Sequence, residues 1–426
     1  MISTILGAFR IGEIRNKVLF TAALLALYRL GTHIPAPGIS SQAASQIQKS
    51  LGSSGIFGLL NLFSGGGLGR IAIFALGIMP YITASIILQL LTVVVPSLEK
   101  LQKEGEVGQA RITQYTRYLT VGLAFAQSIG YVFLFRSFQK QAGVTLITNF
   151  TLFKVFFIVI SLTAGCVLLM WMGELITQRG IGNGISLLIF ASIVARIPNG
   201  IHAWWTNPDQ VFRVVMPFIA VGVVAAVVFV QEGQRRIPIQ YAKRVIGRRM
   251  TQGGQTYLPL RVNMAGVIPV IFAASVMAIP PTIGQLLGQN RNNFGTDLAN
   301  FFSPQGWHYV LGESILIILF TYFYTAVTFN PVDQADNLKK YGGFIPGVRP
   351  GRPTAEFLDR ILARLTFPGA LFLAAIAAFP TILINQTNAN FFFGGTSILI
   401  VIGVALDTMK QLEAQLMMRN YEGFLK

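Results

Sequence analysis

Few residues of this chain have the types and spacing that catalysis requires. Gly52-Ser-Ser-Gly55 has the glycine-flanked serine of a Gly-x-Ser-Gly nucleophile, but no histidine lies within a central apolar stretch to activate it. No His-Glu-x-x-His motif is present, and the single cysteine, Cys166, lies in an apolar run. The sequence therefore predicts no catalytic residue, and we expect a protein that is not an enzyme.

The sequence also lacks the residues that metal and nucleotide sites require. The three histidines, His33, His202 and His308, are far apart in the chain and would need several carboxylates to complete a zinc site. No Gly-Lys dipeptide occurs, which excludes a Walker A loop. Gly180-Ile-Gly-Asn-Gly184 lacks the strand and helix context of a dinucleotide loop. We expect neither a bound metal nor a cofactor.

Four charged residues lie within apolar stretches: Arg29, Glu174, Glu313 and Asp407. A charge deep in a bilayer costs roughly 2.5–3.5 kcal/mol on insertion scales and would need a function. These four lie mostly near the predicted ends of the stretches, where they can reach the interface or pair. An ion-coupled solute transporter, which needs intramembrane charges, stays open as an alternative.

Composition places the chain in the membrane. Of its 426 residues, 53% are hydrophobic and only 12% are charged, and its mean hydropathy is +0.59. A soluble fold cannot hide so much apolar surface, because too much of it would face water. The chain is predicted to be an all-α polytopic membrane protein.

Ten apolar stretches are near the length that crosses about 30 Å of hydrocarbon. Each must be helical, since lipid offers no partner to backbone polar groups. The fifth opens with a glycine-rich turn. The ten predicted spans are 18–34, 71–95, 118–135, 152–176, 181–197, 211–231, 264–287, 309–330, 366–384 and 391–409.

The distribution of basic residues sets the orientation. With the N-terminus in the cytoplasm, 24 of the 33 Lys and Arg residues fall in inner segments and 8 in outer ones. This excess predicts that both termini are cytoplasmic. Two inner loops are long and rich in charge: 232–263 carries seven basic residues against one acidic, and 331–365 six against four. Such loops are expected of surfaces that dock an acidic partner. Alternating apolar residues at Ile237, Ile239 and Tyr241 predict a two-stranded ribbon in the first loop.

A short apolar segment, Ile56–Phe63, follows the first span and is too short to cross the membrane. The glycine run Gly65–Gly67 ends it and provides a hinge. Such a segment can re-enter from the outer side, where non-helical backbone survives only inside protein or a wet cavity. Broken helices of this kind mark transport pathways.

Several longer strings of residues resemble the SecY family, the channel subunits of the bacterial secretory translocon. The resemblance covers nearly the whole chain, in order and at plausible spacing. The strings are Gly77-Ile-Met-Pro-Tyr-Ile-Thr-Ala-Ser-Ile-Ile-Leu-Gln89, Glu174-Leu-Ile-Thr-Gln-Arg-Gly-Ile-Gly-Asn-Gly-Ile-Ser186, Arg235-Arg-Ile-Pro-Ile-Gln-Tyr-Ala-Lys-Arg244, Asn263-Met-Ala-Gly-Val-Ile-Pro269, Ala335-Asp-Asn-Leu-Lys-Lys340 and Phe344-Ile-Pro-Gly-Val-Arg-Pro-Gly351.

The resemblance implies an hourglass channel built from two pseudo-symmetric five-helix halves, residues 1–200 and 201–426, in the cell inner (plasma) membrane. It implies passage of unfolded secretory polypeptides across the membrane and lateral release of hydrophobic segments into lipid. The implied partners are the subunits SecE and SecG, the motor SecA, the ribosome with its RNA, the translocating preprotein with its signal peptide, and membrane lipid.

The resemblance also assigns roles to residues. An aliphatic constriction gates by dewetting and fits any passing side chain. The implied pore ring is Ile78, Ile82, Ile189, Ile271 and Ile400. The implied plug, about residues 55–67, has an apolar body of Ile56, Phe57, Leu59, Leu60, Leu62 and Phe63. Gln89 and Gln127 are polar candidates on a lateral gate between spans two and three on one side and spans seven and eight on the other. Arg244, Arg248, Arg249 and Arg349 are the implied docking residues for the motor or the ribosome.

Overall fold

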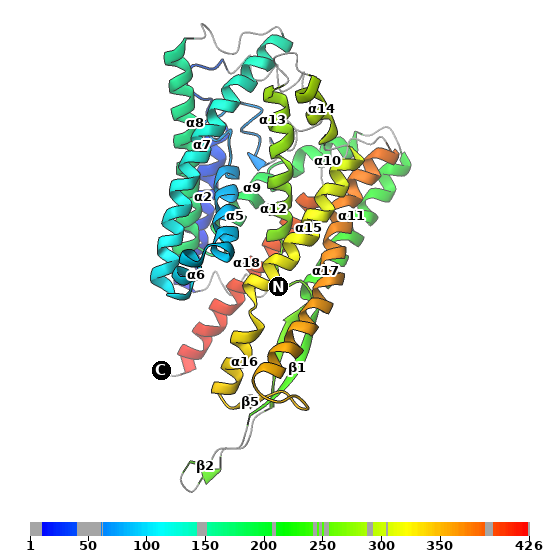
Figure 1. Ribbon diagram of the computed structural model, residues 1–426. Coiled ribbons are helices and arrows are strands. Elements are labelled where there is room, and N and C mark those ends of the chain that lie inside the picture. The colour runs from blue at the N-terminus through cyan, green and yellow to red at the C-terminus, as the bar shows by residue number, and fades with distance from the viewer. Residues whose placement is uncertain are drawn as a thin grey trace.

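The computed structural model describes the chain except for residues 1–10, 41–60, 62, 143–150, 207–209, 242–244, 247–248, 251–254, 288–292, 304–305, 388–394 and 425–426. The described part forms two groups of helices side by side, with a slender sheet extending from one end (Figure 1). We call this end of the molecule the hairpin end. The pair Arg15, Lys17 precedes the apolar part of the first helix, and that helix begins in the described residues at Gly12.

The first group of helices comes from the N-terminal part of the chain. Its longest members, α7 and α8, pack against each other, and α5 packs on α7. The elements are α2 (Gly12–Gly31), α5 (Met79–Val94), α6 (Pro96–Lys103), α7 (Glu106–Ala142), α8 (Leu152–Arg179), α9 (Gly184–Val194) and α10 (Ile197–Trp205).

The second group follows in the chain and meets the first where α12 contacts α5 and α18 contacts α9. Helices α15 and α17 pack side by side within it. The elements are α11 (Gln210–Glu232), α12 (Ile268–Met277), α13 (Ile279–Leu287), α14 (Asn293–Phe301), α15 (Trp307–Thr328), α16 (Pro331–Lys340), α17 (Arg352–Thr387) and α18 (Gly395–Phe424).

Within the described residues, six helical segments are long and apolar enough to cross a membrane. A seventh is the pair α5 and α6, if these two helices, which meet at a bend of 98°, count as one span. Helix α12 with the start of α13 is a shorter apolar segment, Ile268–Pro281. The all-α membrane fold is therefore confirmed, whereas the count of ten spans stays a prediction.

The predicted second span, 71–95, is wrong at its start. Helix α5 begins only at Met79, with Pro80 in its first turn, where a missing N–H costs nothing. Residues 71–78 form turns because their backbone pairs with the end of the first span. The Ala36 N–H donates to the Ile71 carbonyl at 2.9 Å, and the Ile73 N–H donates to the Ile34 carbonyl at 3.0 Å.

Two more boundaries differ from the prediction. The predicted span 264–287 is split into α12 and α13 at Ala278, just before Pro280 and Pro281, which cannot donate to the helix ladder. The predicted loop 331–365 contains helix α16, and its last part is the start of α17. By contrast, the turn predicted at the start of the fifth span is present, since α9 begins at Gly184 and Asn183 caps it.

The ribbon predicted in loop 232–263 is confirmed. Strand β1 (Gln234–Tyr241) pairs antiparallel with β4 (Gln255–Arg261). Ile237 and Ile239 are both buried, at 4% and 3% exposed, and Ile237 belongs to a small core. Strands β2 (Val245–Ile246) and β3 (Arg249–Met250) pair with each other beyond them.

A third strand joins this ribbon from the other long loop. Strand β5 (Gly343–Phe344) pairs with β1, so the order is β4-β1-β5. Apolar residues of both loops then form one core, separate from that of the helices. It consists of Ile237, Leu260, Phe329, Ile345, Leu358, Ile361 and Leu362. The two basic loops are one folded unit.

Candidate functional site

The five isoleucines assigned to the pore ring are all buried, and all belong to the main apolar core. They come from four helices: Ile78 caps α5 and Ile82 follows within it, while α9, α12 and α18 supply one each. Their exposed fractions are 3% for Ile78 and Ile82, 1% for Ile189, 4% for Ile271 and 0% for Ile400. The structure therefore places residues separated by more than 300 positions in the same main core of the helices and leaves none of the five on the exposed surface.

The end of the predicted plug lies against this cluster. Phe63 is 3% exposed and belongs to the same core. A Cβ added to Gly77, which has φ +60°, would lie 3.1 Å from the Phe63 carbonyl oxygen, so the two chain segments touch directly before Ile78. The other plug residues, Ile56, Phe57, Leu59, Leu60 and Leu62, lie outside the described residues.

The glycine hinge behind the plug is held in place by side chains from two helices. The Arg29 guanidinium donates to the Gly65 carbonyl at 2.9 Å. The hydroxyls of Tyr28 and Ser192 share a hydrogen bond of 2.5 Å between α2 and α9. A Cβ on Gly65, which has φ +63°, would meet the Tyr28 hydroxyl at 2.6 Å. Gly65 therefore lies directly against this pair of hydroxyls, which fixes the position of the hinge.

The hinge segment is also bonded internally. The Asn61 side-chain oxygen accepts from the Gly69 N–H at 2.9 Å, and the Ser64 hydroxyl accepts from the Leu68 N–H at 3.0 Å. Leu68 itself is fully buried. The guanidinium of Arg70, at the end of this segment, is partly desolvated near Arg29, and both effects lower the pKa of Arg70. A fixed turn thus joins the plug to α5.

A cavity of about 250 Å³ lies at the seam between the two groups of helices. Gln127, one of the two predicted gate residues, lines it from α7. Helix α5 contributes Met79 and Thr83, and α12 contributes Ser275. The remaining lining residues are Leu123, Ala126, Gly130 and Tyr131 of α7 with Ala278, Ile279 and Ile283 at the α12–α13 break. The cavity thus lies between the predicted spans two, three and seven, and no described residue of span eight lines it. The lateral gate between spans two and three and spans seven and eight stays a prediction.

The second predicted gate residue, Gln89, does not line this cavity. It is half-buried near the end of α5, and its side-chain oxygen is buried without a hydrogen-bond partner among the described residues. The two glutamines therefore occupy different surroundings, and Gln127 is the one that faces the second group of helices.

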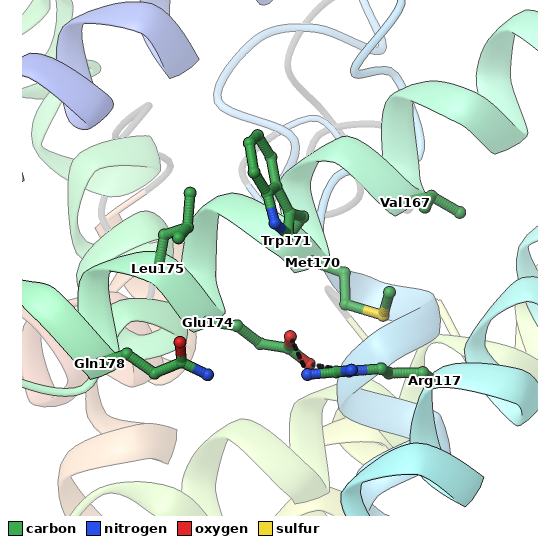
Figure 2. Close-up of a pocket in the computed structure, with 7 residues that line it drawn as sticks. All are labelled: Arg117, Val167, Met170, Trp171, Glu174, Leu175 and Gln178. Carbon is green, nitrogen blue, oxygen red and sulfur yellow. Dashed lines mark hydrogen bonds and ion pairs between the residues drawn. The ribbon is translucent and has the colours of Figure 1, made fainter.

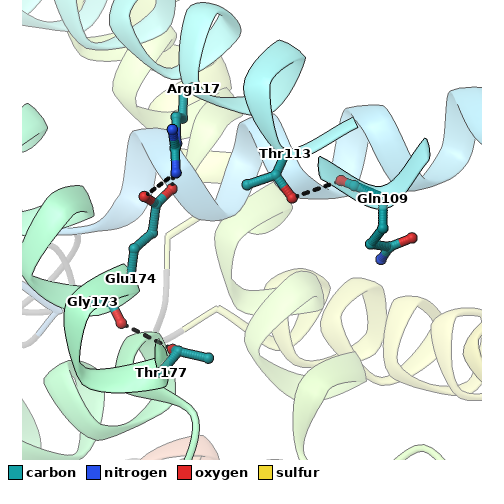
Figure 3. A network of polar contacts seen from close by, with 6 residues as sticks. All are labelled: Gln109, Thr113, Arg117, Gly173, Glu174 and Thr177. Atoms are coloured by element: carbon teal, nitrogen blue, oxygen red, sulfur yellow. Dashed lines mark hydrogen bonds and ion pairs between the residues drawn. The ribbon is translucent and has the colours of Figure 1, made fainter. Parts of the chain in front are cut away.

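An ion pair joins α7 to α8. The Nε and Nη2 atoms of Arg117 donate to the two Glu174 oxygens at 2.8 and 2.6 Å (Figure 3). One turn further along α8, the Thr177 hydroxyl donates to the Gly173 carbonyl and accepts from the Gly184 N–H, each at 2.9 Å. The expectation that Glu174 pairs near the end of its span is confirmed.

Of the other charged residues in apolar stretches, Glu313 departs from the expectation. It is 7% exposed within α15 and has no ion pair or hydrogen bond to the residues that the structure describes. Asp407 is instead exposed on α18, one turn from Lys410, which pairs with Glu232 at 2.7 Å. The sequence pattern did not separate these two cases, because burial depends on the neighbouring helices.

Only part of the predicted docking surface lies in the described residues. Arg349 is exposed on the turn between β5 and α17, and its carbonyl accepts from the Thr354 hydroxyl at 2.8 Å. Arg249 begins β3, although its side chain is not described. Arg244 and Arg248 lie outside the described residues. Among the described residues, no group of three or more His, Cys, Asp or Glu side chains could hold a metal ion.

Comparisons with known proteins agree with the fold and the motifs described above. The family model described as SecY matches residues 72–409. The chain is 51% identical over 443 residues to the protein translocase subunit SecY of Streptomyces galbus, and 49% identical over 442 residues to those of Corynebacterium glutamicum and Mycobacterium tuberculosis. In each case the match covers 100% of this chain and 100% of the relative.

Solved structures share the fold at lower sequence identity. A structure described as that of a protein conducting channel matches with a TM-score of 0.64 and 19% identity, covering 93% of this chain and 91% of that one. Sec61 in the canine ribosome-channel complex matches with a TM-score of 0.60 and 18% identity, with the same coverage. The identity to curated relatives over the full length, together with this fold, shows that the chain belongs to the SecY family.

Proposed function

We propose that this chain is the channel-forming subunit of a protein translocase, through which unfolded secretory polypeptides cross the membrane. The observation that carries the proposal is that the five isoleucines from α5, α9, α12 and α18 are all buried in the main apolar core, to which Phe63 of the plug also belongs. Membership of the SecY family supports it, since the relatives named above are translocase subunits. Ion-coupled solute transport has no such support.

The ring seals the idle channel by excluding water. An apolar constriction dewets when empty and so blocks ions, whereas a peptide can displace the side chains. Isoleucine suits this task because it makes no directional hydrogen bond that a moving chain would have to break. The seal needs no bound group and no catalytic residue, in keeping with a channel that is not an enzyme.

The plug closes the channel on the side of the ring away from the hairpin, and it pivots behind Gly65. The hydrogen bond from Arg29 and the contact with Tyr28 hold the pivot while the apolar body moves. The lateral gate opens along the α5–α7 and α12–α13 seam, where the cavity lined by Gln127 leaves the two sides incompletely packed. Hydrophobic segments leave through this seam into lipid.

The hairpin end is the cytoplasmic docking surface. Arg349 and the basic residues of loop 232–263 bind the motor SecA or the ribosome, since guanidinium groups form paired hydrogen bonds with carboxylates and phosphates. One solved relative is Sec61 in a ribosome-channel complex, which supports a ribosome as partner. SecE and SecG are the accessory subunits, and residues 1–200 and 201–426 are the two halves of the channel. The excess of basic residues at the hairpin end supports an inner-membrane protein with both termini in the cytoplasm.

Site-directed crosslinking tests the path directly. The native Cys166, which is 1% exposed, is replaced by Ala, and single cysteines are placed at Ile82 and Ile271. A secretory chain stalled during translocation should crosslink to both positions. A cysteine at Ile158, a buried core position on α8, is the matched control and should not react. Equal reaction at Ile158, or none at Ile82 and Ile271, would place the path elsewhere.

A further inference from the structure

The exposed face of the α7–α8 pair carries a groove that belongs neither to the proposed pore nor to the proposed gate. One hollow of about 360 Å³ lies beside the Arg117–Glu174 ion pair, and Trp171 and Val167 border it (Figure 2). A second hollow of about 510 Å³ is lined by Phe125, Ile160, Thr163, Ala164, Val167, Leu168 and Trp171. Val167 and Trp171 line both, so the two hollows are neighbours along α8, and we call them together the α7–α8 groove.

The groove is polar at one end and apolar along the rest of its length. Apart from the indole of Trp171, Thr163 is the only polar side chain among the residues that line the second hollow, and its hydroxyl already donates to the Val159 carbonyl at 2.8 Å. Glu174 and Ile160 are 14 residues apart, which corresponds to a helical rise of about 21 Å. A single leaflet of hydrocarbon is about 15 Å thick. The apolar lining on α8 runs only from Ile160 to Trp171, 11 residues or about 16.5 Å of helical rise, which is close to one leaflet. The apolar part therefore matches one acyl chain whose headgroup lies at the ion pair.

The polar end has a defined pattern of charge. Arg117 uses two of its five N–H groups on Glu174, so three remain to donate. The side chain of Arg117 is 43% exposed and that of Glu174 is 12% exposed. Gln178, one turn beyond Glu174, lies on the same side of α8 and adds an amide oxygen (Figure 2). Trp171, which is 55% exposed, lies next to this polar end, as is common for tryptophan at a membrane interface.

We propose that the α7–α8 groove binds one phospholipid whose headgroup carries both a phosphate and a primary ammonium, as in phosphatidylethanolamine. The phosphate accepts from the free N–H groups of Arg117, and the ammonium donates to the oxygens of Glu174 and Gln178. Because the Arg117–Glu174 pair is neutral, it gives no net attraction to an anionic lipid, whose phosphate would also meet the Glu174 carboxylate. A quaternary ammonium has no N–H to donate, which disfavours phosphatidylcholine.

Native mass spectrometry of the complete translocase complex in detergent measures this preference. Dioleoyl phosphatidylethanolamine, phosphatidylcholine and phosphatidylglycerol are added in separate titrations. One molecule of phosphatidylethanolamine should be retained per chain, about tenfold more tightly than either of the others, as one or two charge-assisted hydrogen bonds would give. Equal retention of the three lipids, or preference for phosphatidylglycerol, would overturn the proposal.

Two variants separate the headgroup site from the tail groove. Glu174→Gln should abolish the preference for phosphatidylethanolamine over phosphatidylcholine. Ala164→Trp, at an exposed position in the second hollow, should prevent retention of every lipid tested. Ala375→Trp, at an exposed position on α17, is the matched control and should retain the lipid as the wild type does. Unchanged retention in Ala164→Trp would contradict the tail groove even if Glu174→Gln failed to fold.

The groove has one competing occupant, a helix of an accessory subunit. A photoreactive residue in place of Trp171 distinguishes the two. Crosslinks to added phosphatidylethanolamine are expected, whereas a crosslink to a protein subunit alone would overturn the lipid assignment. None of these measurements involves translocation, so their outcome is independent of the function proposed above.

Discussion

Ser275 of α12 and Met79 of α5 meet at the seam between the two groups of helices, with the Ser275 hydroxyl oxygen 3.8 Å from the Met79 sulfur. Both residues border the seam cavity, and each is coupled to a ring isoleucine. Met79 follows Ile78 directly, and the Ser275 hydroxyl donates to the Ile271 carbonyl at 2.7 Å. The proposed gate and the proposed pore ring are therefore joined through this pair of side chains.

Replacing Met79 by Ala should loosen the closed gate. The change removes the contact with Ser275 and enlarges the cavity of about 250 Å³. Loss of a buried methionine side chain costs roughly 2–5 kcal/mol of stability. Secretory chains with defective signal sequences should then be translocated several-fold better, as an assay with vesicles would show. Thr83→Ser, which keeps the cavity polar and leaves the Met79–Ser275 contact intact, should behave as wild type.

Replacing Ile78 and Ile271 together by Ser should open an ion leak. Two hydroxyls within the constriction would keep it hydrated, so dewetting would no longer block ions. Conductance of the idle channel in planar bilayers should rise at least several-fold. Ile158→Ser introduces the same polar group into the core of α8, away from the proposed pore. If both variants conduct equally, the leak comes from general loosening of the helical core and not from loss of the seal at the proposed ring.

Replacing Arg29 by Gln should release the hinge of the plug. The substitution removes the hydrogen bond to the Gly65 carbonyl, which leaves that backbone group without its partner. We expect more frequent opening of the idle channel, seen as brief conductance events in single-channel records. Arg29→Lys retains a donor and should restore part of the closed time. A Gln variant with the closed times of the wild type would show that the hinge is held by other contacts.

The sequence predicted the helical membrane fold, because long apolar runs are local signals, and its motifs selected five isoleucines that the structure buries in the main apolar core. That these five form a pore ring stays a prediction. It did not predict that 71–78 would be non-helical, since those residues are as apolar as the helix that follows. The pairing of Ala36 with Ile71 across the chain decides their conformation. The sequence also could not show that Gln89 lies away from the seam cavity. The rotation of a helix about its own axis depends on the helices that pack against it and not on sequence spacing.

The joint core of the two long loops was missed for a related reason. Strand β5 has only two residues, and its pairing with β1 spans about a hundred positions of sequence, as Gln240 opposite Phe344 shows. So short a strand is too brief to show the alternation of apolar and polar residues from which strands are predicted. Charge density alone indicated that both loops dock a partner, whereas the structure shows them as a single unit.

Reversing the charge of Arg349 should impair motor-driven transport while the complex still assembles. Arg349 is exposed on the β5–α17 turn, where a Glu would repel an acidic partner surface. ATP-dependent translocation should fall several-fold, and the loss should shrink at high salt because screening weakens the repulsion. The matched control is Arg349→Lys, which keeps the positive charge at the same exposed position and should retain most of the transport.

The folded unit of the two loops makes a further prediction about how docking reaches the channel. Leu358, on α17, is fully buried in the core that α17 shares with the sheet. Leu358→Ala should destabilise this unit by about 2–5 kcal/mol, so that limited proteolysis cuts both loops faster. Because α17 continues from this unit into the helical bundle, motor-driven translocation should fall while idle conductance stays at the wild-type level (Figure 1). Faster cleavage of only one loop would show that the loops fold separately, and the shared core would then have no role in docking.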